Sequence, residues 1–165
     1  MARFEGIKEY SCHIDGAWVA AGSGNVFESI DPFTARHWAT FPKCDAGDVD
    51  KAVAAARAAF ETGEWSRTNP TQRGQLLRRL GDLIARDADY LAAVEVQDNG
   101  KLLAEMRGQV GYIPQWFYYF AGMADKVEGA VMPIDKPEMF TYTRHEPVGV
   151  VAAITPWNSP LLLLA

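Results

Sequence analysis

The residues with the clearest chemical potential lie close to the carboxyl end of the chain. The stretch Thr155-Pro156-Trp157-Asn158-Ser159 follows a continuous apolar run and precedes a second one, Leu161 to Leu164. The Asn158 side chain offers a neutral amide donor, and α/β sheets place their sites on loops at the carboxyl ends of buried strands. Taken alone, however, the Pro-Trp-Asn loop favours a structural role, as a turn into the next helix.

Two thiols are the other candidates for chemistry. Cys12 and Cys44 belong to no CxxC pair and share no zinc-site spacing with a histidine. Cys44 lies near His37, so a cofactor-free hydrolase using Cys44 is one alternative, although nothing in the sequence sets its geometry. Buried or incidental thiols explain both residues better, and a disulfide between them stays open. We expect His13 and His145 to be structural.

The composition predicts an ordinary globular protein. The 165 residues are 48% hydrophobic and 22% charged, which is enough apolar material for a core. A net charge of −5 argues against a nucleic-acid partner, because such domains are usually basic. Residues 1–10 have no apolar signal segment, and no run approaches the roughly 20 apolar residues of a membrane span. We therefore expect a cytoplasmic protein with no membrane partner.

The amino-terminal part reads as a small antiparallel element. Residues 1–12 are expected to form an arm. Asp15-Gly16 between apolar residues predicts a β-hairpin over residues 13–19. Short strands are expected over residues 26–30 and 36–41, at the edge of a larger structure.

Helices are expected to follow. The first is capped by Asp45 or Asp48, and the second by Asn69, with Pro70 at its first position and Gln72 completing a capping box. The third begins at Asp87 or Asp89, runs to about Gln97 and stops at Asn99-Gly100. The fourth carries one apolar seam with spacings of three and four, interrupted by a kink expected at a proline: Leu103, Met106, Val110, Ile113, Phe117 and Phe120, with Pro114.

The last part changes character. Residues 129–137 read as a loop, and 140–146 as an exposed or intersubunit strand. The continuously apolar residues 148–154 predict a parallel strand buried on both faces. Ser159 as N-cap and Pro160 would then open a helix, so strand, loop and helix start resemble the beginning of a βαβ unit. We expect the sequence to be a truncated piece of a longer protein.

These segments together resemble the NAD(P)-dependent aldehyde dehydrogenases. The resemblance is carried by the order and spacing of several short matches, no one of which decides it. They are Ile14-Asp15-Gly16 with Trp18, Asp31-Pro32-Phe33-Thr34, residues 48–60, Trp65-Ser66, Arg73, residues 76–80, Asp98-Asn99-Gly100-Lys101, Ala121-Gly122, residues 124–126 and 142–150, and Ile154-Thr155-Pro156-Trp157-Asn158.

The resemblance implies an α/β fold, namely the N-terminal part of an aldehyde dehydrogenase-like fold with a small hairpin, a helical layer and the first Rossmann-like strand. Residues 13–138 would supply the hairpin and helical layer of the cofactor-binding domain. Residues 139–147 would be an oligomerisation strand, and 148–165 the first parallel strand and active-site loop. A small-molecule aldehyde substrate, NAD or NADP, and a homodimer or homotetramer follow from the same resemblance.

The family's chemistry assigns roles to individual residues by motif. A cysteine thiolate attacks the aldehyde, hydride leaves for the nicotinamide, and water activated by a glutamate hydrolyses the thioester. By this resemblance Asn158 stabilises the oxyanion, and the cofactor is contacted by Ile154, Thr155, Pro156 and Trp157. Tyr112, Trp116 and Ser159 would flank the substrate tunnel, where Ser159 replaces the usual Phe and makes the tunnel wider or more polar.

The implied catalytic cysteine and glutamate lie beyond residue 165, so we expect the fragment to be inactive alone. Core packing is the alternative for Tyr112 and Trp116, and strand-end packing for residues 154–157. A stand-alone oligomerisation or interaction module without catalysis is the alternative for the whole chain.

Overall fold

The computed structural model describes residue 4 and residues 6–165, so part of the predicted 1–12 arm lies outside the described residues. The predicted hairpin is confirmed: β2 (Cys12–Ile14) pairs antiparallel with β3 (Ala17–Val19). Its turn places Asp15 and Gly16 at φ of 52° and 76°. Successive positive φ values are those of a type I′ turn, which matches the twist of the two strands.

The other two predicted strands are also confirmed. β4 (Val26–Asp31) and β5 (Arg36–Pro42) are antiparallel, with an irregularity between Ser29 and Ile30. β1 (Lys8–Glu9) adds in parallel to β5, which gives the order β1-β5-β4. Aromatic rings pack across this small sheet, because Phe41 stacks on Phe27 and on Tyr10.

The helices begin where their capping residues predict. α1 (Ala46–Glu61) is capped by Asp45, whose carboxylate accepts the backbone N–H groups of Gly47 and Asp48. α3 (Pro70–Arg86) has the predicted capping box between Asn69 and Gln72. A short helix not predicted from the sequence, α2 (Glu64–Arg67), lies between them.

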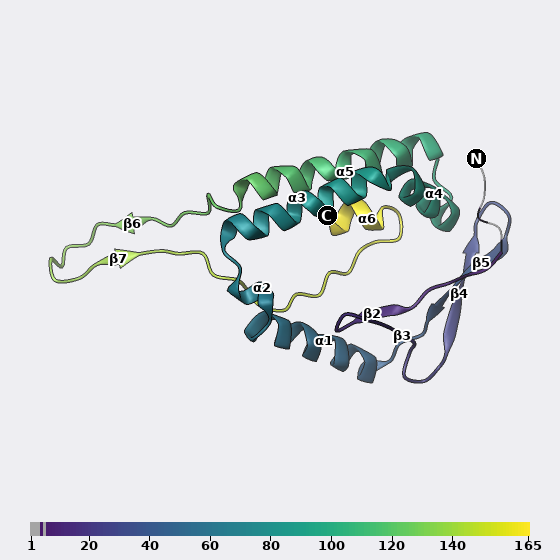
Figure 1. The fold of residues 1–165 in the computed structure, drawn as a ribbon, viewed down its shortest axis with the longest axis horizontal. Coiled ribbons are helices and arrows are strands. Elements are labelled where there is room, and N and C mark those ends of the chain that lie inside the picture. The colour runs from purple at the N-terminus through teal and green to yellow at the C-terminus, as the bar shows by residue number, and fades with distance from the viewer. Residues whose placement is uncertain (1–3, 5) are drawn as a thin grey trace.

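α3, α4 (Ala88–Asn99) and α5 (Leu103–Met123) form one layer, with α1 and the amino-terminal strands β2 to β5 apart from it (Figure 1). α4 ends at Gly100 in the left-handed conformation, with φ 77°. α3 and α5 approach closely at Gly74: a Cβ built there would lie 2.6 Å from the carbonyl oxygen of Ala121. The close contact between α3 and α5 therefore requires a residue without a side chain at position 74.

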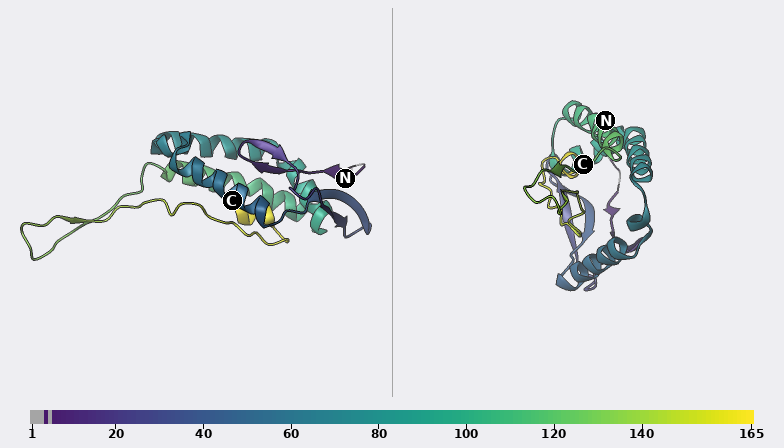
Figure 2. Two further views of the ribbon diagram at one scale, coloured as in Figure 1. Left: turned by 90° about the horizontal axis from the view of Figure 1, so that it is seen from below. Right: turned by 90° about the vertical axis from the view of Figure 1, so that its left-hand side faces the viewer.

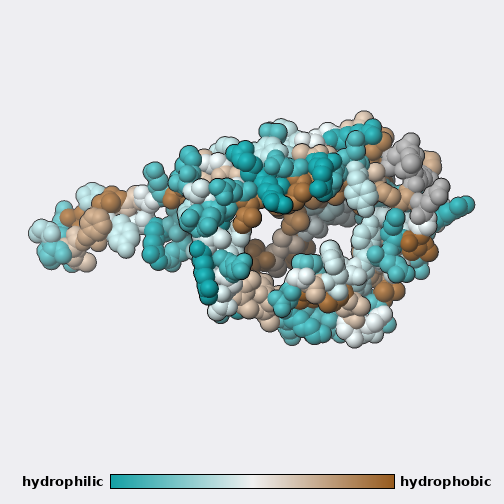
Figure 3. Space-filling view, viewed as in Figure 1, coloured by the Kyte–Doolittle hydropathy of each residue, from teal (hydrophilic) through white to brown (hydrophobic). Residues whose placement is uncertain are grey.

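The core sits inside this helical layer. Met106, Val110 and Ile113 from the predicted seam are almost fully buried, against Ile84 and Ala92. The seam is shorter than predicted, because Phe120 is 53% exposed. α5 continues through Pro114 as one helix. In the end-on view α1 lies well apart from this layer (Figure 2), and the space-filling view shows an open gap between the two parts (Figure 3).

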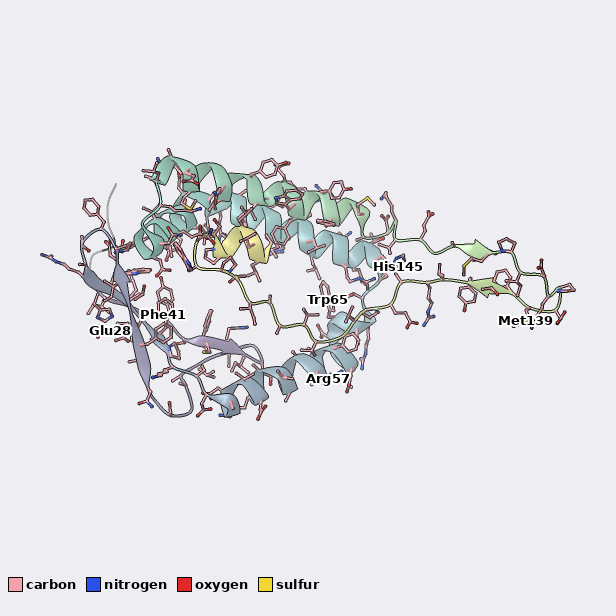
Figure 4. All side chains as sticks on the ribbon, turned by 180° about the vertical axis from the view of Figure 1, so that it is seen from behind. Glu28, Phe41, Arg57, Trp65, Met139 and His145 are labelled. Carbon is pink, nitrogen blue, oxygen red and sulfur yellow. The ribbon has the colours of Figure 1, made fainter. Side chains whose placement is uncertain are left out.

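A hairpin projects from one end of the helical layer. β6 (Val131–Met132) pairs antiparallel with β7 (Thr141–Tyr142), with Met139 near its tip and His145 at its base (Figure 4). The predicted strand over 140–146 is therefore shorter, and β6 lies where a loop was predicted. The strand is shorter because a β-ladder extends only as far as both of its strands supply pairing residues. Tyr142 is exposed, as predicted for this strand.

The buried strand predicted over residues 148–154 is not found. These residues pair with no strand in the described part of the chain, and the side chains of Val148 and Ile154 are 94% and 95% exposed. A run that is apolar on both faces indicates a preference for burial, but a β-strand forms only when a partner strand lies beside it. Here the segment approaches α1 at Gly149, where a Cβ would lie 3.9 Å from Nη1 of Arg57.

The predicted helix start after this segment is confirmed. α6 (Pro160–Leu164) begins after Ser159, with Pro160 at its first position. Leu161 and Leu162 pack against the helical core, whereas Leu163 and Leu164 are more than half exposed. Among the described residues, no helix is both long and apolar enough to cross a membrane.

Candidate functional site

The loop that carries Asn158 lies between the exposed 148–154 segment and α6. Asn158 itself is exposed, and so are Pro156 and Trp157, whereas Thr155 is half-buried. Within the described residues no hydrogen bond involves the Asn158 side chain, and only its backbone carbonyl is engaged, by Oγ of Ser159 at 2.7 Å. The amide group is thus free to donate to another molecule.

The Ser159 side chain anchors the loop through hydrogen bonds to Lys101 and Gln109. Its side chain is buried, with 6% of the residue exposed, and Oγ lies 2.9 Å from Nζ of Lys101 and 3.1 Å from Oε1 of Gln109. Lys101 donates to the hydroxyl oxygen, while the hydroxyl hydrogen can go to either Gln109 or the Asn158 carbonyl. Lys101 also lies 3.7 Å from the carboxylate of Glu105. The loop is therefore tied to the residues just before α5 and to the second turn of α5.

A buried carboxylate anchors the start of α6. Glu95 on α4 is only 7% exposed, and its Oε1 accepts the backbone N–H of Leu161 at 3.0 Å. Because Pro160 has no N–H, Leu161 supplies the first donor of this helix, and an acidic group there also suits the helix dipole. Glu95 thus fixes the residues that immediately follow Asn158.

The two aromatic residues predicted at the substrate tunnel lie on the same face of α5 as Gln109. Positions 109, 112 and 116 are spaced by three and four, which places them on one helical face. Tyr112 and Trp116 are 56% and 44% exposed, and their rings make an edge-to-face contact with centroids 5.7 Å apart. They line a shallow hollow to which none of residues 154–159 contributes. Both are therefore surface side chains in this chain, beside the anchor of the Asn158 loop.

The structure does not support the alternative of a Cys44–His37 pair. Sγ of Cys44 lies 3.2 Å from Sγ of Cys12, and the pKa of the Cys44 thiol is raised to about 11, chiefly by the hydrogen bond with Cys12. His37 is engaged elsewhere, with Nε2 2.9 Å from the carbonyl oxygen of Ala39 and 3.0 Å from Oγ1 of Thr40. A nucleophilic cysteine needs a lowered pKa and a nearby base, and Cys44 has neither feature.

Three residues of this region were not predicted as site residues: Glu95, Lys101 and Gln109. Their partners lie 50 to 66 positions away in the chain, so no local spacing joins them. One signal was available for Glu95, which is the single acidic residue in the apolar stretch from Leu91 to Val96. A charge in such a stretch is either exposed or satisfied by a specific partner.

Comparison with known proteins identifies the class to which this fold and loop belong. The family model described as "Aldehyde dehydrogenase family" matches residues 18–165. The chain belongs to the aldehyde dehydrogenase family.

Among curated relatives, the chain is 46% identical over 154 residues to the human protein named "Aldehyde dehydrogenase, mitochondrial", covering 92% of this chain and 30% of that protein. It is 42% identical over 159 residues to (Z)-2-((N-methylformamido)methylene)-5-hydroxybutyrolactone dehydrogenase of Acinetobacter baylyi, covering 96% and 32%. The chain thus spans about a third of the length of these relatives.

Solved structures give the same result. An NAD-dependent aldehyde dehydrogenase from Sinorhizobium meliloti superposes with a TM-score of 0.90 at 36% identity, over 95% of this chain and 32% of that one. A variant betaine aldehyde dehydrogenase from Staphylococcus aureus, in complex with NAD+, also gives 0.90, at 38% identity and the same coverage. The arrangement of helical layer, hairpins and C-terminal loop is therefore that of the corresponding third of this fold.

Proposed function

We propose that this chain is part of an enzyme that oxidises an aldehyde to a carboxylic acid with NAD+ or NADP+, and that Asn158 stabilises the oxyanion of that reaction. The observation that carries the proposal is the contrast between a fixed backbone and a free side chain. Ser159 and Leu161 are held by Lys101, Gln109 and Glu95, while the Asn158 amide donates to nothing in the described residues.

An amide suits this task for electrostatic reasons. Attack on an aldehyde carbon places negative charge on the carbonyl oxygen, and a donor already aimed at that oxygen needs no reorganisation as the charge develops. The amide is neutral at every working pH, so it adds no charge that would oppose formation of a thiolate nearby. Neither Cys12 nor Cys44 is assigned as the nucleophile, because each contacts the other.

The neighbouring residues fit a cofactor surface. Ile154, Pro156 and Trp157 are exposed, and the backbone of this segment pairs with no strand in the described residues, so ring faces and backbone groups remain available. When bound, the nicotinamide cofactor accepts the hydride that leaves the substrate carbon. We assign residues 154–157 to contact with that cofactor.

We assign Tyr112, Trp116 and Ser159 to the wall of the aldehyde tunnel. The support is that Gln109, on the same face of α5 as both aromatics, contacts Ser159 directly. A hydroxyl bound to Lys101 makes this wall polar where the family usually has an aromatic ring. We therefore propose that a substituted or polar aldehyde is preferred over a simple alkyl one.

The exposed hairpin supports an oligomeric enzyme. β6 and β7 project beyond the helical layer (Figure 1), and Val131 and Tyr142 on these strands and Phe140 just before β7 are each more than half exposed. Apolar side chains on an isolated two-stranded ribbon favour a partner. We propose a homodimer or homotetramer located in the cytoplasm. The same hairpin would serve a non-catalytic interaction module, which remains the second candidate.

Substitution of Asn158 tests the proposal. In the longer protein that contains this chain, Asn158→Ala is expected to lower kcat by about 10²–10³ while the Kd of the cofactor stays nearly constant. Asn25→Ala, which changes an exposed asparagine far along the chain, is the matched control and should leave kcat unchanged. Equal kcat in the Asn158→Ala variant and the parent removes Asn158 from the mechanism, and no aldehyde oxidation by the parent favours the interaction module.

A further inference from the structure

The two cysteines of the chain meet at a place that the proposed reaction does not use. Cys12 lies on β2 and Cys44 immediately before the N-cap of α1, yet their Sγ atoms are 3.2 Å apart across a sequence separation of 32. A disulfide bond is about 2.05 Å long, so the sulfur atoms need to approach by only about 1 Å. They are the only two cysteines in the sequence.

The surroundings hold the two thiols in this relationship. The carboxylate of Asp48, in the first turn of α1, accepts the backbone N–H of Gly22 through both oxygens at 3.0 Å. Gly22 follows the β2–β3 hairpin, so the hairpin is pinned to the start of α1 independently of the sulfur atoms. Groups that the fold already holds together react with a high effective concentration.

Small oxidants can reach the pair. Cys44 is exposed and Cys12 is half-buried. We propose that Cys12 and Cys44 are an oxidative modification site, which a low-molecular-weight disulfide such as oxidised glutathione converts to an intramolecular disulfide. The inference does not depend on the proposed enzymatic function.

The reaction proceeds by two exchanges. One protein thiolate attacks a sulfur of the small disulfide, forms a mixed disulfide and releases one thiol. The second protein thiol, losing its proton, then attacks the protein sulfur of that mixed disulfide and releases the second small thiol. The protein loses two hydrogens and two electrons are transferred to the small disulfide, which is reduced to two thiols.

Two features shape the rate and the result. The pKa of Cys44 is raised to about 11, first by the hydrogen bond with Cys12, then by loss of solvation and less by the nearby Asp48 and Asp45 carboxylates, so little Cys44 thiolate exists at neutral pH. Since the thiolate is the attacking species, oxidation should accelerate with rising pH. Once formed, the bond would fasten the β2–β3 hairpin to α1 and close a loop that contains β4 and β5.

The test uses purified protein equilibrated with reduced and oxidised glutathione, followed by acid quenching and intact-mass analysis. The expected product has lost two hydrogens and carries no glutathione, and peptide mapping should join Cys12 to Cys44. The ratio of oxidised to reduced protein should rise with the concentration of oxidised glutathione divided by the square of the reduced glutathione concentration. That dependence identifies a disulfide within the protein.

The single variants Cys12→Ser and Cys44→Ser are matched controls for each other. Each retains one thiol and should form a mixed disulfide with one glutathione, with first-power dependence on reduced glutathione. A parent protein that carries two glutathione adducts, or that forms only disulfide-linked dimers, would overturn the proposal.

Discussion

Oε1 of Glu95 on α4 lies 3.0 Å from the backbone nitrogen of Leu161 on α6, across 66 positions of sequence. Glu95 is buried, and the helix that it contacts begins two residues after Asn158. Glu95 therefore connects the packed helical layer to the loop on which the catalytic proposal rests.

Replacement of Glu95 should loosen that loop. Glu95→Ala leaves the Leu161 N–H without its acceptor and removes buried side-chain volume, so the free energy of unfolding should fall by about 1–3 kcal/mol. Glu95→Gln keeps an acceptor oxygen and should lose less. In the longer protein, kcat should fall in the same order. Both kcat and urea unfolding are measured for the two variants and the parent. A Gln variant as impaired as the Ala variant would show that the negative charge, rather than acceptance, is what matters.

Lys101 should contribute more to the free energy of unfolding than an exposed lysine does. Lys101→Met removes the cation that donates to the buried Ser159 hydroxyl, and we expect a loss of about 1–2 kcal/mol in the free energy of unfolding, since bonds from charged groups are the stronger ones. Lys126→Met is the matched control: Lys126 pairs with Asp125 at an exposed position, where such pairs contribute about 0–1 kcal/mol. Equal losses in the two variants would contradict the role of Lys101 as donor to the buried Ser159 hydroxyl.

The close approach of α3 and α5 predicts opposite effects for two glycines. Gly74→Ala would place a Cβ 2.6 Å from the carbonyl oxygen of Ala121, so the helices must separate, at a cost of about 1–3 kcal/mol. Gly111→Ala on α5 meets nothing within 4 Å and should stabilise the helix by about 0.5–1 kcal/mol. Thermal melts of both variants against the parent measure the difference. A Gly74→Ala variant that melts with the parent would mean that the helices pack less closely.

The lowered pKa of Asp48 predicts how the stability of the fold depends on pH. Its pKa is lowered from the ordinary value of 3.8, first by the N–H of Gly22 and then by the N–H of Asp45, with Lys51 adding a smaller effect. A carboxylate with a lowered folded-state pKa stabilises the fold above 3.8, and this contribution is lost as pH falls through the folded-state pKa. Asp48→Asn should therefore be less stable than the parent at pH 7, with a smaller loss on acidification. Asp50→Asn, at an exposed position of the same helix, should retain the parent's pH profile.

Local signals in the sequence predicted much of the fold. The pair Asn69 and Gln72 set the start of α3, and Asp15-Gly16 set the turn of the first hairpin, because each depends only on residues within four positions. The buried centre of α5 followed from the spacing of Met106, Val110 and Ile113. Periodicity could not show that Phe120 is 53% exposed, because spacing alone does not show which neighbours cover a position of the seam.

The errors fall where structure depends on distant partners. Residues 148–154 have the composition of an internal strand, but the described chain places no strand beside them. The contacts from Glu95, Lys101 and Gln109 to the loop were missed for the same reason. The loop sequence itself indicated Asn158. The residues that fix the position of the loop could be identified only from the packing of α4, α5 and α6.

The uncovered segment between Val148 and Ile154 has a practical consequence for handling the protein. It presents unpaired peptide groups along an extended chain together with large apolar side chains, the combination from which intermolecular sheets grow. Wherever nothing shields it, concentration alone should drive self-association there before the helices lose any structure. Loss of solubility and loss of fold would then be separate events, beginning at different places in the same molecule.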